Sequence, residues 1–286
     1  MLVDPDGILN LEDNLINNWT PFQSDMAIKR FKELINKLSN KDKFPYFRVD
    51  LTRKYGKEFV SLSDEYISNL ISFSYKGMWI GIDDPIWWMR KKIKQKVGIN
   101  LFNYYKPIYI SFKKDQFITI TKNYLEKLFK SIISNKKVKY IILDEGYASL
   151  NPSRVLKYFD CPKMIIVHRD PRDIFVGALK NKFHFIPCKI EAFINWTKYL
   201  QEQTSLYSNS DNKVLRIQFE DLVLKYEETV KIILEFLCVK NFRHINKRKY
   251  FNPDISIKNI EIWKNYKNQH EIELIYNNLK EYCYKH

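Results

Sequence analysis

The segment 163–182 constrains the fold more than any other part of the chain. It reads KMIIVHRDPRDIFVGALKNK, in which a short apolar run ends at Val167 and a proline follows at position 171. Such a run, without polar alternation, is typical of a strand inside a parallel sheet. Proline is favoured in the first turn of a helix, because the N–H that it lacks has no helical partner there. The sequence therefore predicts a buried strand, a turn at Arg169 and Asp170, and a helix that begins at Pro171.

This strand, turn and helix together predict an anion-binding site. The free backbone amides and the positive dipole end of a helix N-terminus point toward the preceding turn. The guanidinium of Arg169 adds planar donors that suit a phosphate dianion. In an open α/β sheet, the carboxyl ends of the strands are also where ligands bind. A structural alternative stays open, in which Arg169 and Asp170 only cap the helix and pair with Asp173 or Glu145.

From about residue 106, short apolar runs alternate with longer helical segments, which is typical of βαβ units in a parallel sheet. Before that point the apolar spacing indicates mainly helices, and Thr20 and Pro21 form a helix start signal. We therefore expect an α/β chain. The expected strands are 108–112, 138–143, 163–167 and 214–219. The expected helices start at Pro21 and after Pro152, and cover 64–73, 87–97, 116–134, 171–182, 190–207, 226–237 and 271–284.

No repeat, low-complexity stretch or linker marks a domain boundary, so we predict one domain over residues 1–286. Residues 1–105 would form a mainly helical variable part and residues 106–286 the α/β core. There is no secretory signal and no apolar stretch of the roughly 18 residues that span a membrane, so we expect a cytoplasmic protein without a transmembrane segment. Its four cysteines are isolated and no HExxH motif occurs, so we expect reduced thiols and no metal.

The formal net charge of +15 favours a polyanionic partner, such as a phosphorylated cofactor, an acidic glycan or nucleic acid. The excess is mostly lysine and is spread along the chain. The densest run, RKKIKQK at 90–96, is interpreted as a solvated helix face. Trp87 and Trp88 beside it offer only a weak version of the aromatic and basic pattern of nucleic-acid-binding proteins, and no nucleic-acid partner is expected.

The run 163–177, of the form K-M-I-I-V-x-R-D-P-R-D-x-x-x-G, resembles the 3′-phosphate-binding strand and helix of the sulfotransferases that use 3′-phosphoadenosine 5′-phosphosulfate. In that family an arginine after the strand and a serine eight positions later bind the 3′-phosphate of the cofactor. Arg169 matches the arginine, and Gly177 stands where the serine is expected. The resemblance therefore implies a phosphate site at Arg169 that lacks one of its usual ligands.

Two further stretches follow in the family's order. The run 216–237, RIQFEDLVLKYEETVKIILEFL, is similar to a family segment of strand, acidic pair and helix, and supports the fold alone. The run 251–266, FNPDISIKNIEIWKNY, is similar to the late basic loop that closes over the cofactor. Trp263 and Lys264 match the Trp-Lys of that loop, and Lys258 is the residue nearest to its cationic contact with the 3′-phosphate.

The resemblance implies a three-layer, P-loop-NTPase-like parallel sheet flanked by helices, and transfer of a sulfuryl group to a hydroxyl or amine of an acceptor. The acceptor is expected to be a carbohydrate, the other product is adenosine 3′,5′-bisphosphate, and no metal is required. Glu145 stands where cytosolic family members carry their catalytic histidine, with Asp144 as the second candidate. The structural alternative is that both carboxylates cap the turn before Pro152.

The chain departs from the family at its start, because no glycine lies in the expected GxxxSGT-like loop that holds the 5′-phosphosulfate. The first strand and this loop are therefore expected to be missing. The preferred explanation is that the sequence begins downstream of the true N-terminus, and the other is a degenerate relative. Two alternative functions stay open: a catalytically inactive binding module with the sulfotransferase fold, and a basic nucleic-acid-binding protein.

Overall fold

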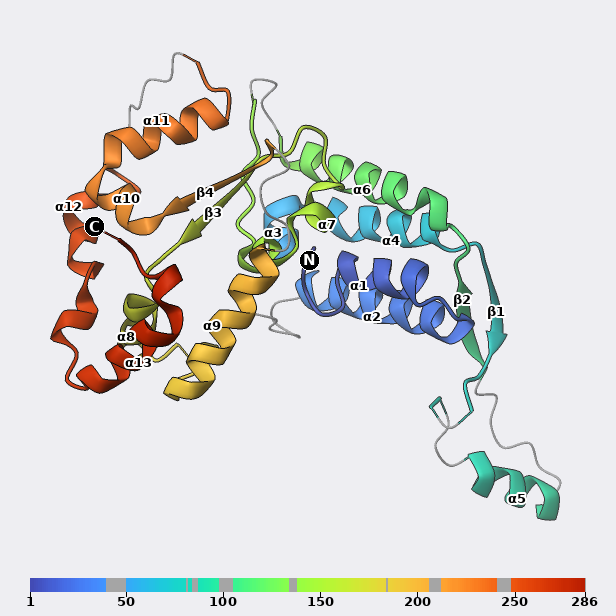
Figure 1. Cartoon of the computed structure of the whole chain (residues 1–286). Coiled ribbons are helices and arrows are strands. Elements are labelled where there is room, and N and C mark those ends of the chain that lie inside the picture. The colour runs from blue at the N-terminus through green and yellow to red at the C-terminus, as the bar shows by residue number, and fades with distance from the viewer. Residues whose placement is uncertain are drawn as a thin grey trace. The chain divides into compact units, whose positions relative to one another are not determined.

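The computed structural model describes residues 1–39, 50–80, 82–83, 87–97, 105–133, 138–183, 185–205, 212–240 and 248–285. The chain divides into two compact units (Figure 1). The first comprises Met1–Glu145 with Lys157–Phe159, and the second comprises Gly146–Leu156 with Asp160–His286. Strands in the described residues form one two-stranded sheet in each unit, so the predicted α/β class is confirmed in this coarse form. Within the same residues, no helix has the length and apolar character to cross a membrane.

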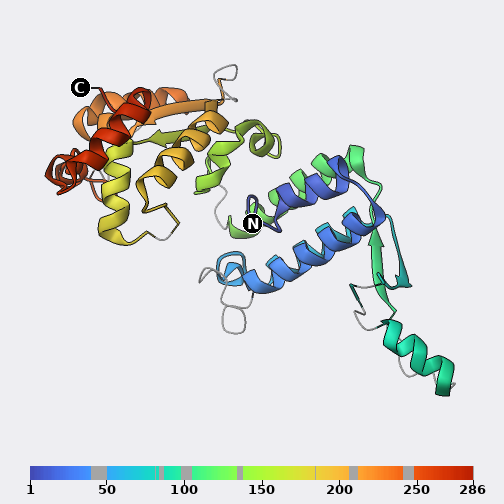
Figure 2. The ribbon, with the colours of Figure 1, turned by 60° about the horizontal axis from the view of Figure 1, so that its bottom comes forward.

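The first unit is mainly helical. Its elements are α1 (Ile8–Glu12), the π-helix η1 (Asp13–Asn17), α2 (Pro21–Ser39), α3 (Leu51–Tyr55), α4 (Glu58–Leu70), β1 (Phe73–Gly77), α5 (Trp87–Val97), β2 (Lys106–Ile110), the 3-10 turn η2 (Lys114–Gln116) and α6 (Phe117–Ile132). Helices α2, α4 and α6 pack together, with α1 against α2 (Figure 2). The start of α2 at Pro21 is confirmed. Helix α4 begins and ends earlier than the predicted 64–73.

The core between these helices combines buried rings with paired hydroxyls. The rings of Tyr66 and Tyr124 stack with their centroids 4.4 Å apart. The hydroxyl of Tyr124 lies 2.8 Å from Ser63 Oγ, and the hydroxyl of Tyr66 lies 3.0 Å from Thr121 Oγ1. Because each buried hydroxyl has a partner, these polar groups avoid most of the desolvation penalty of burial.

Strands β1 and β2 form an antiparallel pair, with Phe73 opposite Ile110 and Gly77 opposite Lys106. The sequence analysis placed a strand at 108–112 in a parallel sheet, and the pairing part of that prediction is wrong. The strand exists at 106–110, but its partner is the segment that follows α4, which had been assigned in part to the helix. Apolar alternation indicates a strand without indicating its partner, so the direction of pairing could not be derived from it.

The second unit carries a parallel strand pair and most of the remaining helices. Its elements are η3 (Gly146–Leu150), α7 (Pro152–Leu156), β3 (Met164–His168), α8 (Pro171–Asn181), α9 (Ile190–Ser205), β4 (Val214–Gln218), α10 (Phe219–Leu224), α11 (Tyr226–Phe236), α12 (Pro253–Ser256), η4 (Ile257–Asn259), η5 (Ile262–Asn265), α13 (Gln269–Leu279) and η6 (Lys280–Tyr282). Strands β3 and β4 run in parallel from Met164 opposite Val214 to His168 opposite Gln218. The predicted strands 163–167 and 214–219 are confirmed to within a residue.

The core of this unit lies among α8, α9 and α13. Phe175, Phe193, Ile275 and Leu279 are fully buried there, and the rings of Phe175 and Phe193 lie 5.0 Å apart. Helix α8 begins at Pro171 after Asp170, as predicted, and its C-cap Lys182 has the left-handed conformation (φ 52°) that often ends a helix. This packing fixes α8, and with it the turn that precedes the helix.

The predicted strand 138–143 is not formed. Residues 138–145 have no regular secondary structure, and the side chains from Val138 to Leu143 are exposed, with Ile142 91% accessible. A strand needs a neighbour to pair its backbone groups, and none among the described residues pairs with this segment. The apolar pattern of the segment was therefore misleading.

Residues 106–132, assigned to the core in the sequence analysis, contact the helices of the first unit. The main division between the units falls after Glu145 instead of at residue 105. The prediction of one domain stays a prediction.

Candidate functional site

The candidate site lies where β3 meets α8, opposite the segment that contains η4 and η5. Arg169 directly follows β3, and its Nη2 donates to the carbonyl of Asn259, at the end of η4, over 2.6 Å. Its guanidinium carbon lies 5.1 Å from the ring centroid of Phe219. Among the described residues Arg169 forms no ion pair, and its buried Nε has no hydrogen-bond partner. The guanidinium is therefore held in place by a carbonyl and a ring, and it interacts electrostatically with the carboxylate of Asp173 without forming an ion pair with it.

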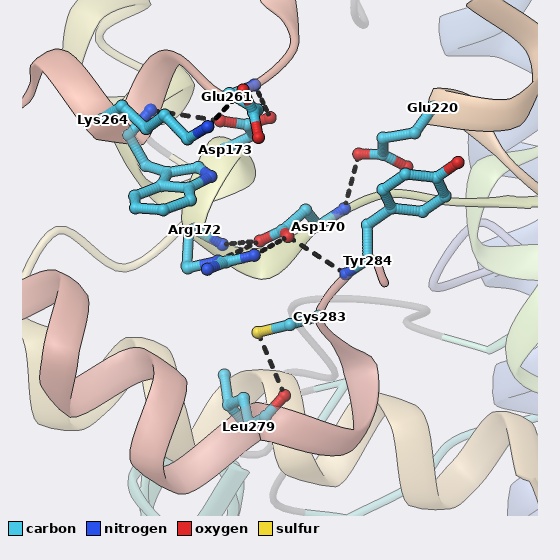
Figure 3. Close-up of polar contacts among 10 residues, drawn as sticks. Asp170, Arg172, Asp173, Glu220, Glu261, Lys264, Leu279, Cys283 and Tyr284 are labelled. Carbon is cyan, nitrogen blue, oxygen red and sulfur yellow. Dashed lines mark hydrogen bonds and ion pairs between the residues drawn. The ribbon is translucent and has the colours of Figure 1, made fainter. Parts of the chain in front are cut away.

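Asp170 organises the turn between β3 and α8 (Figure 3). Its side chain is 2% exposed and accepts from the backbone N–H of Arg172 over 2.8 Å, which caps the helix. It also accepts from Arg172 Nε at 3.0 Å and Nη2 at 2.6 Å, and from the backbone N–H of Tyr284 at 3.1 Å. Capping by Asp170, one part of the structural alternative, is thus confirmed. Its ion-pair partner is Arg172, which the sequence analysis had not considered.

Asp173 connects α8 to the late segment of the chain. It accepts from the backbone N–H of Glu261 over 2.8 Å and from that of Trp263 over 3.2 Å. Burial raises the pKa of Asp173, although these two amides and the charge of Arg169 act in the opposite direction. The guanidinium of Arg172 lies over the ring of Trp263, 4.1 Å from its centroid. These contacts hold η5 against the first turn of α8.

The cofactor residues inferred from the resemblance lie on these contacting elements. Gly177 is buried in α8, and a Cβ added there would lie 3.8 Å from Ile262 Cδ1, which is an ordinary van der Waals contact. Lys258 is exposed on η4, next to Asn259. Lys264 is exposed on η5 and forms an ion pair with Glu261 over 2.6 Å, while Trp263 stacks with Arg172. The structure therefore brings these residues into one region of the second unit.

The predicted catalytic carboxylates belong to the other unit. Asp144 is exposed, and Glu145 is half-buried. Burial is the main cause that raises the pKa of Glu145. Each unit is described by itself, and the catalytic role of Glu145 and Asp144 stays a prediction.

Glu220 is a residue of the site that the sequence analysis did not single out. It is 1% exposed, and its Oε1 accepts the backbone N–H of Asp170 over 3.0 Å. Its Oε2 is buried and has no partner among the described residues. Burial raises the pKa of Glu220, as do the nearby carboxylates of Asp170 and Asp173. No local sequence signal could have shown a contact that joins residues so far apart in the chain.

An open pocket of about 360 Å³ lies beside the end of the strand pair. It is lined by His168, Arg216, Ile217, Gln218, Asp221, Lys225, Glu228, Thr229 and Ile232. Arg216 Nη1 lies 3.2 Å from His168 Nε2, and its Nη2 donates to the carbonyl of Thr204 over 2.7 Å. Burial and the charge of Arg216 lower the pKa of His168. The imidazole of His168 and the guanidinium of Arg216 give this pocket polar groups that could contact a ligand.

No group of three or more His, Cys, Asp or Glu side chains in the described part of the chain could hold a metal ion. The four cysteines are free thiols, and only Cys283 is buried. No family model, curated protein or solved structure matches this chain. The geometry of the site and the sequence resemblance are therefore what support a function.

Proposed function

We propose that the chain is a sulfotransferase that uses 3′-phosphoadenosine 5′-phosphosulfate, with Arg169 as the main ligand of the 3′-phosphate. One observation supports this most strongly. The guanidinium of Arg169 lies at the carboxyl end of a parallel strand, beside a helix N-terminus, with no carboxylate paired to it among the described residues. A phosphate dianion would supply a direct ion-pair partner for the guanidinium, which within the chain has only the electrostatic influence of Asp173.

Other residues of the second unit would complete this phosphate site. Lys258 is exposed beside Asn259, the residue whose carbonyl holds Arg169, and its ammonium would add a second cation. Gly177 offers no hydroxyl, so we expect fewer ligands than in the resembling family. Trp263 would support the site by keeping η5 against α8 through its contact with Arg172, whereas Lys264 pairs with Glu261 in its own segment.

The bound nucleotide would supply an activated sulfuryl group for in-line transfer to an acceptor hydroxyl or amine, which we propose belongs to a carbohydrate. The proton that leaves the acceptor would pass to Glu145, with Asp144 as the second candidate. A carboxyl whose pKa is raised by burial is better matched to this role near neutral pH than an exposed one, which favours Glu145 over Asp144. The strand pair β3 and β4 would then be part of a three-layer, P-loop-NTPase-like sheet.

The proposal is tested by calorimetric titration of the full chain with adenosine 3′,5′-bisphosphate. We expect binding by the wild type and a loss of about 1.5–3 kcal/mol in Arg169→Ala, the usual range for a hydrogen-bonded charged partner. Arg169→Lys should also bind more weakly, because an ammonium lacks the planar pair of donors. The matched control is Arg53→Ala, which removes the same charge from an exposed position on α3.

Two results would refute the phosphate site: no binding by the wild type, or equal affinities of the Arg169→Ala variant and the wild type. The absence of a hydroxyl at Gly177 favours one alternative, an inactive module that retains binding. Transfer of labelled sulfate to a panel of glycans separates the two, because the module would bind the nucleotide without any transfer.

A further inference from the structure

Helix α5 has the highest proportion of basic residues among the α-helices of the described chain. Its sequence, WWMRKKIKQKV, contains five basic residues and no acidic one. The described lysines on it are all exposed. Lys92 Nζ lies 5.7 Å from the ring centroid of Trp88, one turn earlier, where a cation and an aromatic face attract each other. The helix therefore presents a concentrated positive surface.

The same helix also exposes large apolar side chains. Trp88 is 51% exposed, Met89 45% and Ile93 42%. The other side chains described on α5, those of Lys91, Lys92, Lys94, Gln95 and Lys96, are exposed as well, so none of the described side chains of this helix is buried. A solvated polar face, which the sequence analysis favoured for this run, would not need a tryptophan, a methionine and an isoleucine in water.

The order of residues along α5 separates its two kinds of surface in part. Met89 and Ile93 lie one turn apart and share a face. At 100° per residue Lys91 and Lys94 fall on the other side of the helix, and Lys92 and Lys96 lie between Trp88 and the apolar pair. Flanking lysines can extend their ammonium groups to the polar side while their methylene stems cover apolar surface.

We propose that α5 lies in the surface of a membrane that carries anionic lipids, with Met89, Ile93 and Trp88 inserted among the headgroups. A helix with Trp and aliphatic residues exposed beside lysines is typical of interfacial binding, and juxtamembrane lysines are attracted to anionic lipid. A single nucleic-acid strand would use the lysines but leave the aliphatic pair in water. The anionic membrane surface is therefore the partner that accounts for both kinds of exposed residue.

The test is flotation of the full chain with vesicles of phosphatidylcholine, alone or mixed with phosphatidylserine. We expect binding to the mixed vesicles only. Lys92→Ala with Lys96→Ala should weaken it roughly 30-fold, from the usual contribution of a lysine near an anionic surface. Met89→Ser with Ile93→Ser should weaken it by about tenfold or more through lost apolar burial. These side chains are exposed, so both variants should fold, which circular dichroism checks.

The matched control is Lys54→Ala with Lys114→Ala, which removes two exposed lysines of the first unit outside α5 and should change binding by no more than about twofold. The proposal is overturned if the wild type does not bind mixed vesicles, or if neither α5 variant binds more weakly. It is also overturned by two results together: only the lysine variant loses vesicle binding, and the chain binds a single-stranded RNA oligonucleotide more tightly than vesicles. In that case α5 would be a general polyanion site. None of these results bears on nucleotide binding at Arg169.

Discussion

Asp170→Ala is the change that should disturb the candidate site most, because one buried carboxylate serves three groups. It caps α8, pairs with Arg172 through two guanidinium nitrogens and holds the backbone of Tyr284. The side chain of Arg172 is only 11% exposed, so water cannot replace the lost partner fully. Alanine at this position would leave a buried positive charge and two unpaired backbone amides.

The magnitude follows from the burial of this pair. Removing one partner of a buried ion pair destabilises a protein by about 3–5 kcal/mol. Loss of an N-cap alone destabilises a protein by about 1 kcal/mol. This loss is not simply added to that of the ion pair, because the same carboxylate performs both roles. We therefore expect Asp170→Ala to lower the free energy of unfolding by about 4 kcal/mol.

The assay is urea denaturation of the full chain followed by circular dichroism. Asp254→Ala is the control, because its ion pair with Arg248 is largely exposed and should contribute less than about 1 kcal/mol. The double variant Asp170→Ala, Arg172→Met should recover part of the loss, since it also removes the uncompensated charge. A loss below about 1 kcal/mol in the single variant, or no recovery in the double variant, would refute the reasoning.

Two further predictions concern buried titratable groups. Glu220 has a raised pKa, so its contribution to stability is present below its ordinary value of 4.5 and is lost as pH rises through the raised value. Glu220→Gln, which keeps an acceptor for Asp170 N–H, should therefore increase the free energy of unfolding at neutral pH but not at acid pH. Urea titrations at both pH values measure this, and an equal difference between variant and wild type at the two pH values would contradict it. Burial raises the pKa of Cys283 to about 11, so mass spectrometry should show slower alkylation by iodoacetamide than at Cys161, Cys188 and Cys238; equal rates would show an accessible thiolate.

Local signals in the sequence were sufficient to predict several helices and strands of the second unit. The apolar run before Arg169 and the proline at 171 correctly predicted β3 and the start of α8, because strand burial and helix capping depend on neighbouring residues. The run at 214–219 likewise predicted β4. The same kind of signal failed at 138–143, where an apolar pattern exists but no partner strand pairs with it.

The site itself depends on contacts that no local pattern encodes. Glu220 reaches the backbone of Asp170 across 50 positions, and Asp173 accepts amides that lie 88 and 90 positions later. A carboxylate near a helix start, such as that of Glu220, is usually interpreted as a cap. Only the packing of α8 against the late segment shows that these side chains hold the turn around Arg169.

The late position of these partners has a consequence for biosynthesis. The backbone groups of Glu261, Trp263 and Tyr284 complete the hydrogen bonds of Asp170 and Asp173. Until residues 261–284 have left the ribosome, the buried carboxylates of Asp170 and Asp173 lack these partners. The second unit therefore cannot close before this late segment has been synthesised.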